Sequence, residues 1–190
     1  MDVFEAIKSR RSVRAWTQAD IPKETLSLIL EAGRWSPSPL NSQPWHFIVI
    51  KNRQTIETLC SQAREGSFLK FANTCIVITA KEEVLSSDGF ENEERVSLIS
   101  WLKEHDQYLY SAVCTLQNMW LAAWSMGLGG CWVTVDKAST SKLLEIPDNE
   151  KIIGSLALGY ILGTPVAHKD NDRKPLSEMV FVEKYGVREA

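Results

Sequence analysis

Three arginines lie close together near the N-terminus, at Arg10, Arg11 and Arg14, with Ser12 between them. Guanidinium groups present planar forks of N–H donors, which match the oxygens of a phosphate or of a polarised carbonyl edge. The alternative is a solvated charged face at the end of a short helix over residues 2–10, where the helix dipole favours cations. The spacing therefore indicates either an anion-binding loop or an ordinary helix terminus.

A second polar stretch, residues 36–45, carries three prolines within eight residues. Proline fixes its own φ and biases the preceding residue toward extended conformations, so we expect this stretch to hold one shape. Its serines, together with Asn41 and Gln43, offer donors and acceptors suited to a planar heterocycle with polar edges. The stretch is therefore a candidate binding wall, and the alternative is a stiff turn between a helix and a strand.

Glycines at 127, 129 and 130 separate a long apolar helical pattern from an apolar run that is expected to be a strand. Glycine lets the backbone approach a flat ligand and offer N–H groups to it, although a glycine C-cap with a tight turn explains the same pattern. The sequence has no nucleophile elbow, zinc-hydrolase motif, phosphate loop or GxGxxG after a strand. We therefore expect the chemistry, if the protein is an enzyme, to belong to a bound cofactor.

The elements that must position these residues follow from the apolar patterns. Helices are expected over 2–10, 21–33, 52–63, 96–103, 108–126 and 139–145, and strands over 45–50, 74–80, 131–135 and 152–161, with a last strand or arm at 179–182. The strand at 74–80 is apolar on both faces and should be central. The helix at 108–126 is apolar nearly all round, which favours cover by a second subunit. Residues 81–107 are expected to form an excursion that acts as a lid.

Length and composition predict a single globular domain, since the chain has 190 residues of which 44% are hydrophobic. A net charge of -3 argues against a nucleic-acid partner or an anionic membrane surface. No apolar run approaches the ~20 residues that a membrane span needs, so we expect a cytoplasmic protein. The four cysteines lack CxxC spacing and the three histidines are well separated, which favours buried thiols over a disulfide or metal site.

Residues 10–14, 36–45, 127–130 and 173–176 together closely resemble the nitroreductase family of flavoproteins, as four motifs in the right order across nearly the whole chain. The resemblance implies an α+β fold, a three-layer sandwich in which a central, mostly antiparallel sheet is flanked by helices. It also implies an intertwined homodimer. One FMN-binding domain would cover residues 1–190, with 81–107 as its lid.

The resemblance implies an FMN at the dimer interface. It implies no catalytic side chain, because flavin N5 carries the chemistry. It also implies no metal. Arg10, Ser12 and Arg14 would contact the phosphate, the ribitol and the pyrimidine side of the flavin, with Arg11 beside them. The remaining implied residues are Arg173 and Lys174 as a phosphate clamp, Pro37, Ser38, Pro39, Asn41 and Gln43 from the opposite subunit, and the backbone of Gly129 and Gly130 near the ring.

The implied activity is that of an oxidoreductase that uses NADH or NADPH to reduce nitroaromatic, quinone or similar acceptors by a ping-pong hydride transfer. Family membership does not name one reaction. An alternative is a flavin store or sensor of the same fold without NAD(P)H turnover, and a third is a tryptophan-rich dimeric scaffold without a cofactor. An absorbance spectrum of the purified protein separates the third from the first two.

Overall fold

The computed structural model describes residues 1–63, 66–81, 93–165 and 173–188 of the chain. One sheet contains four strands in the order β1-β2-β4-β3, and each neighbouring pair is antiparallel. The strands are β1 (Trp45–Ile50), β2 (Thr74–Lys81), β3 (Leu128–Val133) and β4 (Glu150–Tyr160). The α-helices are α1 (Val3–Ser9), α2 (Lys23–Arg34), α3 (Arg53–Gln62), α4 (Glu93–Glu104), α5 (Gln107–Ser125), α6 (Lys137–Leu144) and α7 (Leu176–Met179), and two short 3-10 helices are η1 (Pro39–Asn41) and η2 (Leu69–Phe71).

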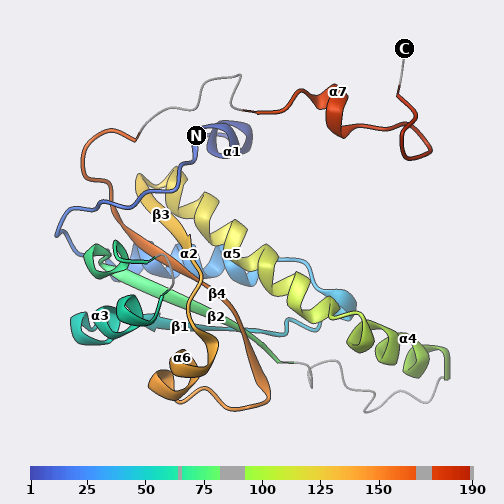
Figure 1. Cartoon of the computed structure of the whole chain (residues 1–190), viewed down its shortest axis with the longest axis horizontal. Helices are drawn as coiled ribbons and strands as arrows, with labels where there is room; N and C mark the ends of the chain where they lie inside the picture. The colour runs from blue at the N-terminus through green and yellow to red at the C-terminus, as the bar shows by residue number, and fades with distance from the viewer. Residues whose placement is uncertain (64–65, 82–92, 166–172, 189–190) are drawn as a thin grey trace.

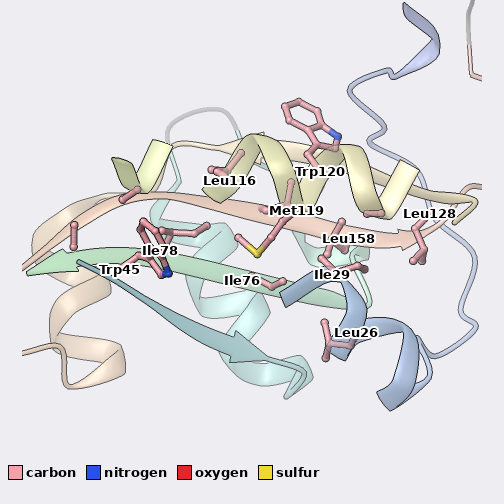
Figure 2. Packing of buried hydrophobic residues seen from close by; sticks show 14 of the residues in the cluster. Leu26, Ile29, Trp45, Ile76, Ile78, Leu116, Met119, Trp120, Leu128 and Leu158 are labelled. Carbon is pink, nitrogen blue, oxygen red and sulfur yellow. The ribbon is translucent and has the colours of Figure 1, made fainter. Parts of the chain in front are cut away.

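The sheet lies between two layers of helices, with α2 and α5 on one face and α3 and α6 on the other (Figure 1). Each face buries its own apolar cluster. Figure 2 shows the α2 and α5 side, where Ile29 and Met119 pack over Ile76 and Leu158 of the sheet. Burying a side chain of this size contributes roughly 1.5–3 kcal/mol before the entropy of ordering is counted. The predicted α+β three-layer sandwich with an antiparallel sheet is confirmed.

Helix α5 packs on the sheet through one stripe of side chains. Its buried residues recur at the three- and four-residue spacing of one helix face, and they are Tyr108, Ser111, Ala112, Thr115, Leu116, Met119, Trp120 and Ala123. The opposite face keeps apolar side chains in solvent, since Tyr110 is 61% exposed and Val113 is 37% exposed. A single chain therefore covers only one side of this helix.

The strand predictions differ in how far the structure supports them. β2 lies between β1 and β4, and its residues 74–80 are all buried, so the prediction of a central strand is confirmed. β1 has the predicted bounds, but it is an edge strand on which His46 is exposed, so the prediction of a buried strand there was wrong. A continuous apolar run cannot by itself distinguish an edge strand with one covered face from a central one.

Two other predictions need correction. Residues 179–182 form no strand: α7 ends at Met179, and the side chains of Met179 and Val180 are exposed, so the alternative of an arm describes this part better. Figure 1 shows α7 extending away from the sheet and its helices. The helix predicted at 96–103 is present as the longer α4, while the loop proposed as part of the lid, residues 82–92, lies outside the described residues.

The segment after α1 attaches the N-terminus to the outer edge of the sheet. Ser12 forms a parallel bridge with Gly130 of β3, and Trp16 forms an antiparallel bridge with Ile161 after β4. The backbone N–H of Val13 donates to the Gly130 carbonyl at 2.9 Å. The indole N–H of Trp16 donates to the Gly129 carbonyl, also at 2.9 Å. These contacts hold residues 10–14 beside β3.

Candidate ligand-binding site

The Arg10 guanidinium lies over an aromatic ring, and the side chain is only half-buried. Its Cζ is 4.0 Å from the centroid of the Trp120 ring, a distance at which the cation is attracted to the π face. Its Nη1 is buried and has no hydrogen-bond partner within the described residues. Burial lowers the pKa of Arg10, and the positive charges of Arg173 and Arg11 lower it further. Arg10 and Arg173 are therefore close enough to repel each other.

The neighbouring predicted residues have different surroundings. Arg11 Nη1 donates to the carbonyls of Lys8, Ser9 and Arg10 at 2.8, 2.7 and 2.8 Å, so part of this guanidinium caps the end of α1. The side chains of Ser12 and Arg14 are exposed, and Arg14 Cζ lies 5.4 Å from the centroid of the Phe68 ring. Arg14 is thus held near the surface without an ion pair in the described parts of the chain.

Gly129 and Gly130 lie inside β3, not in a turn between helix and strand, so that prediction was wrong. The turn itself is made by Gly127, whose φ is 79°. A Cβ on Gly129 would meet the Val13 side chain at 2.7 Å, and a Cβ on Gly130 would meet Trp120 Nε1 at 2.8 Å. Both glycines allow the arginine segment and its aromatic support to pack against the strand.

Cys131 follows these glycines and is buried beneath the arginines. Burial raises the pKa of its thiol, and the nearby charges of Arg14 and Arg10 act in the opposite direction. The thiol therefore stays protonated at neutral pH and serves as a small packing residue, as its apolar sequence context predicts.

A cavity of about 530 Å³ opens along the arginine segment. This volume lies within the range of about 300–1,000 Å³ that is usual for small-molecule and cofactor sites. Its walls come from the segment after α1 and from the chain that follows β4. They are Arg11, Ser12, Val13, Arg14, Ala15, Ile161, Leu162, Thr164 and Pro165.

The proline-rich segment is a tight turn, not the extended chain that its prolines favour. Leu40, Asn41 and Gln43 all have positive φ values, of 53°, 54° and 47°. Such conformations are costly for non-glycine residues and persist only where neighbouring contacts hold them. Here the Gln43 N–H donates to Ser38 Oγ at 2.9 Å. The turn is thus held by hydrogen bonds as well as by its prolines.

This turn is also anchored to α5, because Asn118 Nδ2 donates to the buried Ser36 Oγ at 2.8 Å. Pro37 and Asn41 are exposed, whereas Ser38 and Pro39 are half-buried. Figure 1 shows the chain between α2 and β1 toward the α4 end of α5, while α1 lies at the other end. One chain therefore brings together the predicted residues at 10–14, 129–130 and 173, but holds those at 37–43 apart from them.

Lys174 and Arg173 lie at the start of the exposed C-terminal segment. Of these two residues, only Arg173 acts on the arginine cluster, because its positive charge lowers the pKa of Arg10. Sequence reasoning missed the two aromatic supports of the cluster, Trp120 and Phe68. Trp120 was visible only as one apolar position of a helix, and no local pattern marks an aromatic ring that will meet a guanidinium more than a hundred positions away.

A larger cavity of about 1050 Å³ lies elsewhere, between α6, the start of β4 and Leu109 of α5. It contains none of the predicted site residues. Three lysines and three carboxylates line it, namely Lys137, Lys142, Lys151, Glu145, Asp148 and Glu150. Because these charges balance, this cavity has no preference for a dianion. Within the described residues there is also no cluster of side chains that could hold a metal ion, and no helix long and apolar enough to cross a bilayer.

Comparison with known proteins places this fold in one class. A family model described as the nitroreductase family matches residues 7–160. A relative from Methanothermobacter thermautotrophicus, provisionally named NADH dehydrogenase/NAD(P)H nitroreductase, is 31% identical over 172 residues, which cover 87% of this chain and 80% of the relative. The residues that the family model matches include the arginine segment at 10–14 and all four strands of the sheet.

Solved structures give the same result. A provisionally named nitroreductase from Desulfovibrio desulfuricans, solved in complex with FMN, is 27% identical with a TM-score of 0.75, covering 97% of this chain and 98% of that one. An FMN-dependent nitroreductase from Clostridium difficile R20291 shares the fold, with a TM-score of 0.78 at 23% identity over 96% of this chain and 99% of that one. The molecule thus has a nitroreductase fold. The chain belongs to the nitroreductase family.

Proposed function

We propose that the protein is an FMN-dependent oxidoreductase that takes electrons from NADH or NADPH and passes them to a small acceptor such as a nitroaromatic or a quinone. Relatives named as NAD(P)H nitroreductases and the solved relative in complex with FMN support this assignment. The proposed domain spans residues 1–190, and the proposed location is the cytoplasm. We expect no nucleic-acid or membrane partner.

The observation that carries the proposal is the uncompensated positive charge of the arginine cluster. Arg10, Arg14 and Arg173 form no ion pair within the described residues. Arg10 also keeps a buried donor without a partner. An unpaired buried donor costs about 1–3 kcal/mol, and like charges close together add to this cost. A phosphate dianion removes both costs, so these residues fit the phosphate end of FMN.

The other predicted residues would serve the rest of the cofactor. Ser12 and Arg14 line or border the 530 Å³ cavity and would donate to the ribitol and to the pyrimidine edge. Donors at that edge stabilise the negative charge that collects there on reduction. Bound FMN would supply the two-electron chemistry, which no side chain described here can perform. The protein would set its position, its potential and the access of water.

The separation of the two groups of site residues supports the proposal of a homodimer. The turn at 37–43 lies apart from Arg10 in one chain, so it would reach the cofactor only from a second copy. Several apolar side chains near both groups are exposed, including Phe4 at 71%, Trp35 at 73% and Tyr110 at 61%. Exposed apolar surface of this kind marks an interface. We propose that the two chains bury it and that each lends the other its Ser38 turn.

The absorbance spectrum of the purified protein is the first test. A flavin spectrum, with FMN released on denaturation, is expected; a colourless protein that also fails to bind added FMN would refute the proposal. The second test is anaerobic mixing with NADH and, separately, NADPH. Bleaching of the flavin band within seconds supports the reductase. A protein that stays yellow would instead be a flavin-binding protein without turnover, and the proposed activity would be wrong.

A further inference from the structure

Trp101 and His105 form an exposed aromatic pair on α4. Their rings are stacked, with centroids 4.2 Å apart and planes 19° from parallel. His105 Nδ1 lies 2.8 Å from the Trp101 carbonyl oxygen, and because a carbonyl only accepts, this ring nitrogen is the donor. The Trp101 side chain nevertheless stays 49% exposed. The imidazole therefore covers part of the indole, is itself tied to the helix, and leaves the rest of the ring in solvent.

This arrangement suits the indole to a flat partner. An unrestrained surface side chain loses rotamer freedom when a ligand orders it, and that loss weakens binding. Here the stacked imidazole and its hydrogen bond restrict the Trp101 ring before any ligand arrives. Aromatic rings prefer offset-stacked or edge-to-face contacts with other rings. The pair is thus suited to a flat aromatic molecule, with His105 as the positioning residue for Trp101.

Helix α4 is fixed at the same end of the molecule as the turn at 37–43. Ile99 and Leu102 of α4 are buried in one apolar cluster with Trp45, which begins β1 directly after that turn. Figure 1 shows α4 continuing beyond the end of α5 that lies near the chain between α2 and β1. A second copy of the chain that receives this turn at its cofactor would therefore receive α4 beside it.

We propose that Trp101 is a specificity-determining residue for flat aromatic electron acceptors: held by His105, its indole stacks on the acceptor ring at the cofactor of the second copy. The inference rests on the proposed function for the cofactor and the dimer. A quinone would take a hydride equivalent from the reduced cofactor and a proton from solvent, and would leave as the hydroquinone. The indole takes no part in that transfer, so its effect falls on acceptor binding.

Single-turnover reoxidation tests this inference without NADH or NADPH. The holoprotein is photoreduced anaerobically and mixed with menadione, a flat quinone, or with ferricyanide, which accepts single electrons without stacking. The return of flavin absorbance gives a half-saturating acceptor concentration and a limiting rate. Trp101→Ala should raise the half-saturating menadione concentration about five- to tenfold, as for the loss of an aromatic pair. The limiting rate and the reaction with ferricyanide should stay within about twofold of the unaltered protein, a difference too small to indicate a lost contact.

Two variants of His105 test its positioning role. His105→Ala keeps the indole but removes its restraint, so we expect a smaller rise of about two- to threefold in the half-saturating menadione concentration. His105→Phe keeps a stacked ring and should recover part of this loss. Phe71→Ala is the matched control, because Phe71 on η2 is also 49% exposed and lies outside α4. It should alter the reaction with neither acceptor.

Mixed dimers test which copy supplies the indole. One chain carries Trp101→Ala and keeps Arg14, while the other carries Arg14→Ala and keeps Trp101, and different affinity tags isolate the mixed species. At limiting FMN the cofactor is then held mainly by the first chain. If the indole acts across the dimer, this species should bind menadione as the unaltered protein does. A half-saturating concentration as high as that of the Trp101→Ala dimer would overturn the inference.

Failure of the inference and failure of the proposed function give different results. A protein that holds FMN and shows the menadione effect, but is not reduced by NADH or NADPH, lacks the proposed electron donor and keeps the acceptor site. If Trp101→Ala reacts with menadione as the unaltered protein does, or if menadione and ferricyanide are affected alike, the inference is wrong. A weakened dimer in sedimentation without an effect on menadione would instead assign Trp101 to the subunit interface. A protein that binds no flavin overturns both proposals.

Discussion

Replacing Gly130 with alanine tests how closely β3 packs on Trp120. The added Cβ would lie 2.8 Å from both Cδ1 and Nε1 of Trp120 and 3.2 Å from Leu156 Cδ1. All three atoms are closer than ordinary van der Waals contact allows. Trp120 is a rigid side chain wedged between the strand and Arg10, so it cannot move aside freely. The φ of Gly130 is not positive, and backbone strain therefore adds nothing to this effect.

The expected change in the free energy of unfolding has two parts. Overpacking of a filled core typically costs about 1–3 kcal/mol. Alanine recovers roughly 0.5–1 kcal/mol, because it has less conformational freedom than glycine in the unfolded chain. We therefore expect Gly130→Ala to lose about 1 kcal/mol of stability, within the span of roughly 0–2.5 kcal/mol that the difference of these two contributions allows.

Urea unfolding of the apoprotein, followed by far-UV circular dichroism at one fixed protein concentration, measures this loss. Gly127→Ala is the contrasting variant: nothing lies within 4 Å of its added Cβ, so its cost comes only from its φ of 79°. Combining Trp120→Phe with Gly130→Ala should recover part of the loss, because the smaller ring leaves space for the methyl group. Strictly additive effects of the two substitutions, or a Gly130→Ala protein as stable as the unaltered one, would refute the packing argument.

Three further predictions concern other parts of the molecule. Arg14→Ala should weaken FMN retention by about tenfold or more, as expected for loss of a charge-assisted hydrogen bond, while sedimentation shows an unchanged dimer; unchanged flavin occupancy would count against the site. Ser36→Ala leaves Asn118 Nδ2 without its acceptor, so we expect a loss of about 1–3 kcal/mol in urea unfolding, and a value near zero would show that water replaces the hydroxyl. The hydrogen bond from Arg34, followed by that from Trp35, lowers the pKa of Glu31 to about 2. The stabilising effect of this carboxylate is thus present above its usual pKa of 4.5 and is lost as the pH falls toward 2. A carbon-13 titration should show this midpoint returning upward in Arg34→Ala.

Much of the framework could be predicted from the sequence, because it depends on local apolar periodicity. The bounds of β1 match the prediction, and α5 differs from its prediction by one residue at each end. The apolar run at 180–182 has strand composition, but the described residues give it no neighbouring strand. The composition of a segment indicates its preference for the strand conformation. It does not indicate whether a neighbouring strand is available to pair with it.

The candidate site was less predictable, since its geometry depends on contacts between distant segments. A glycine pair after a helix normally marks a turn, yet Gly129 and Gly130 are required by the side chains of Val13 and Trp120. Likewise, nothing local marks Leu40 as a residue with positive φ. That conformation depends on hydrogen bonds within the turn and on its anchor to Asn118. The sequence therefore predicted candidate residues, but not the contacts that orient them.

The attachment of residues 12–16 to the edge of β3 and β4 also bears on how the protein is made. Arg10 and Arg14 are synthesised well before β3, yet Trp16 is fixed by a carbonyl that lies 113 positions further along the chain. The arginines therefore have no defined geometry until β4 has been synthesised and paired. Under the proposed function, the phosphate of FMN would then bind to the finished chain and not to the growing one. The bound ligand would stabilise the folded state by mass action, to an extent set by the concentration of free ligand in the cell.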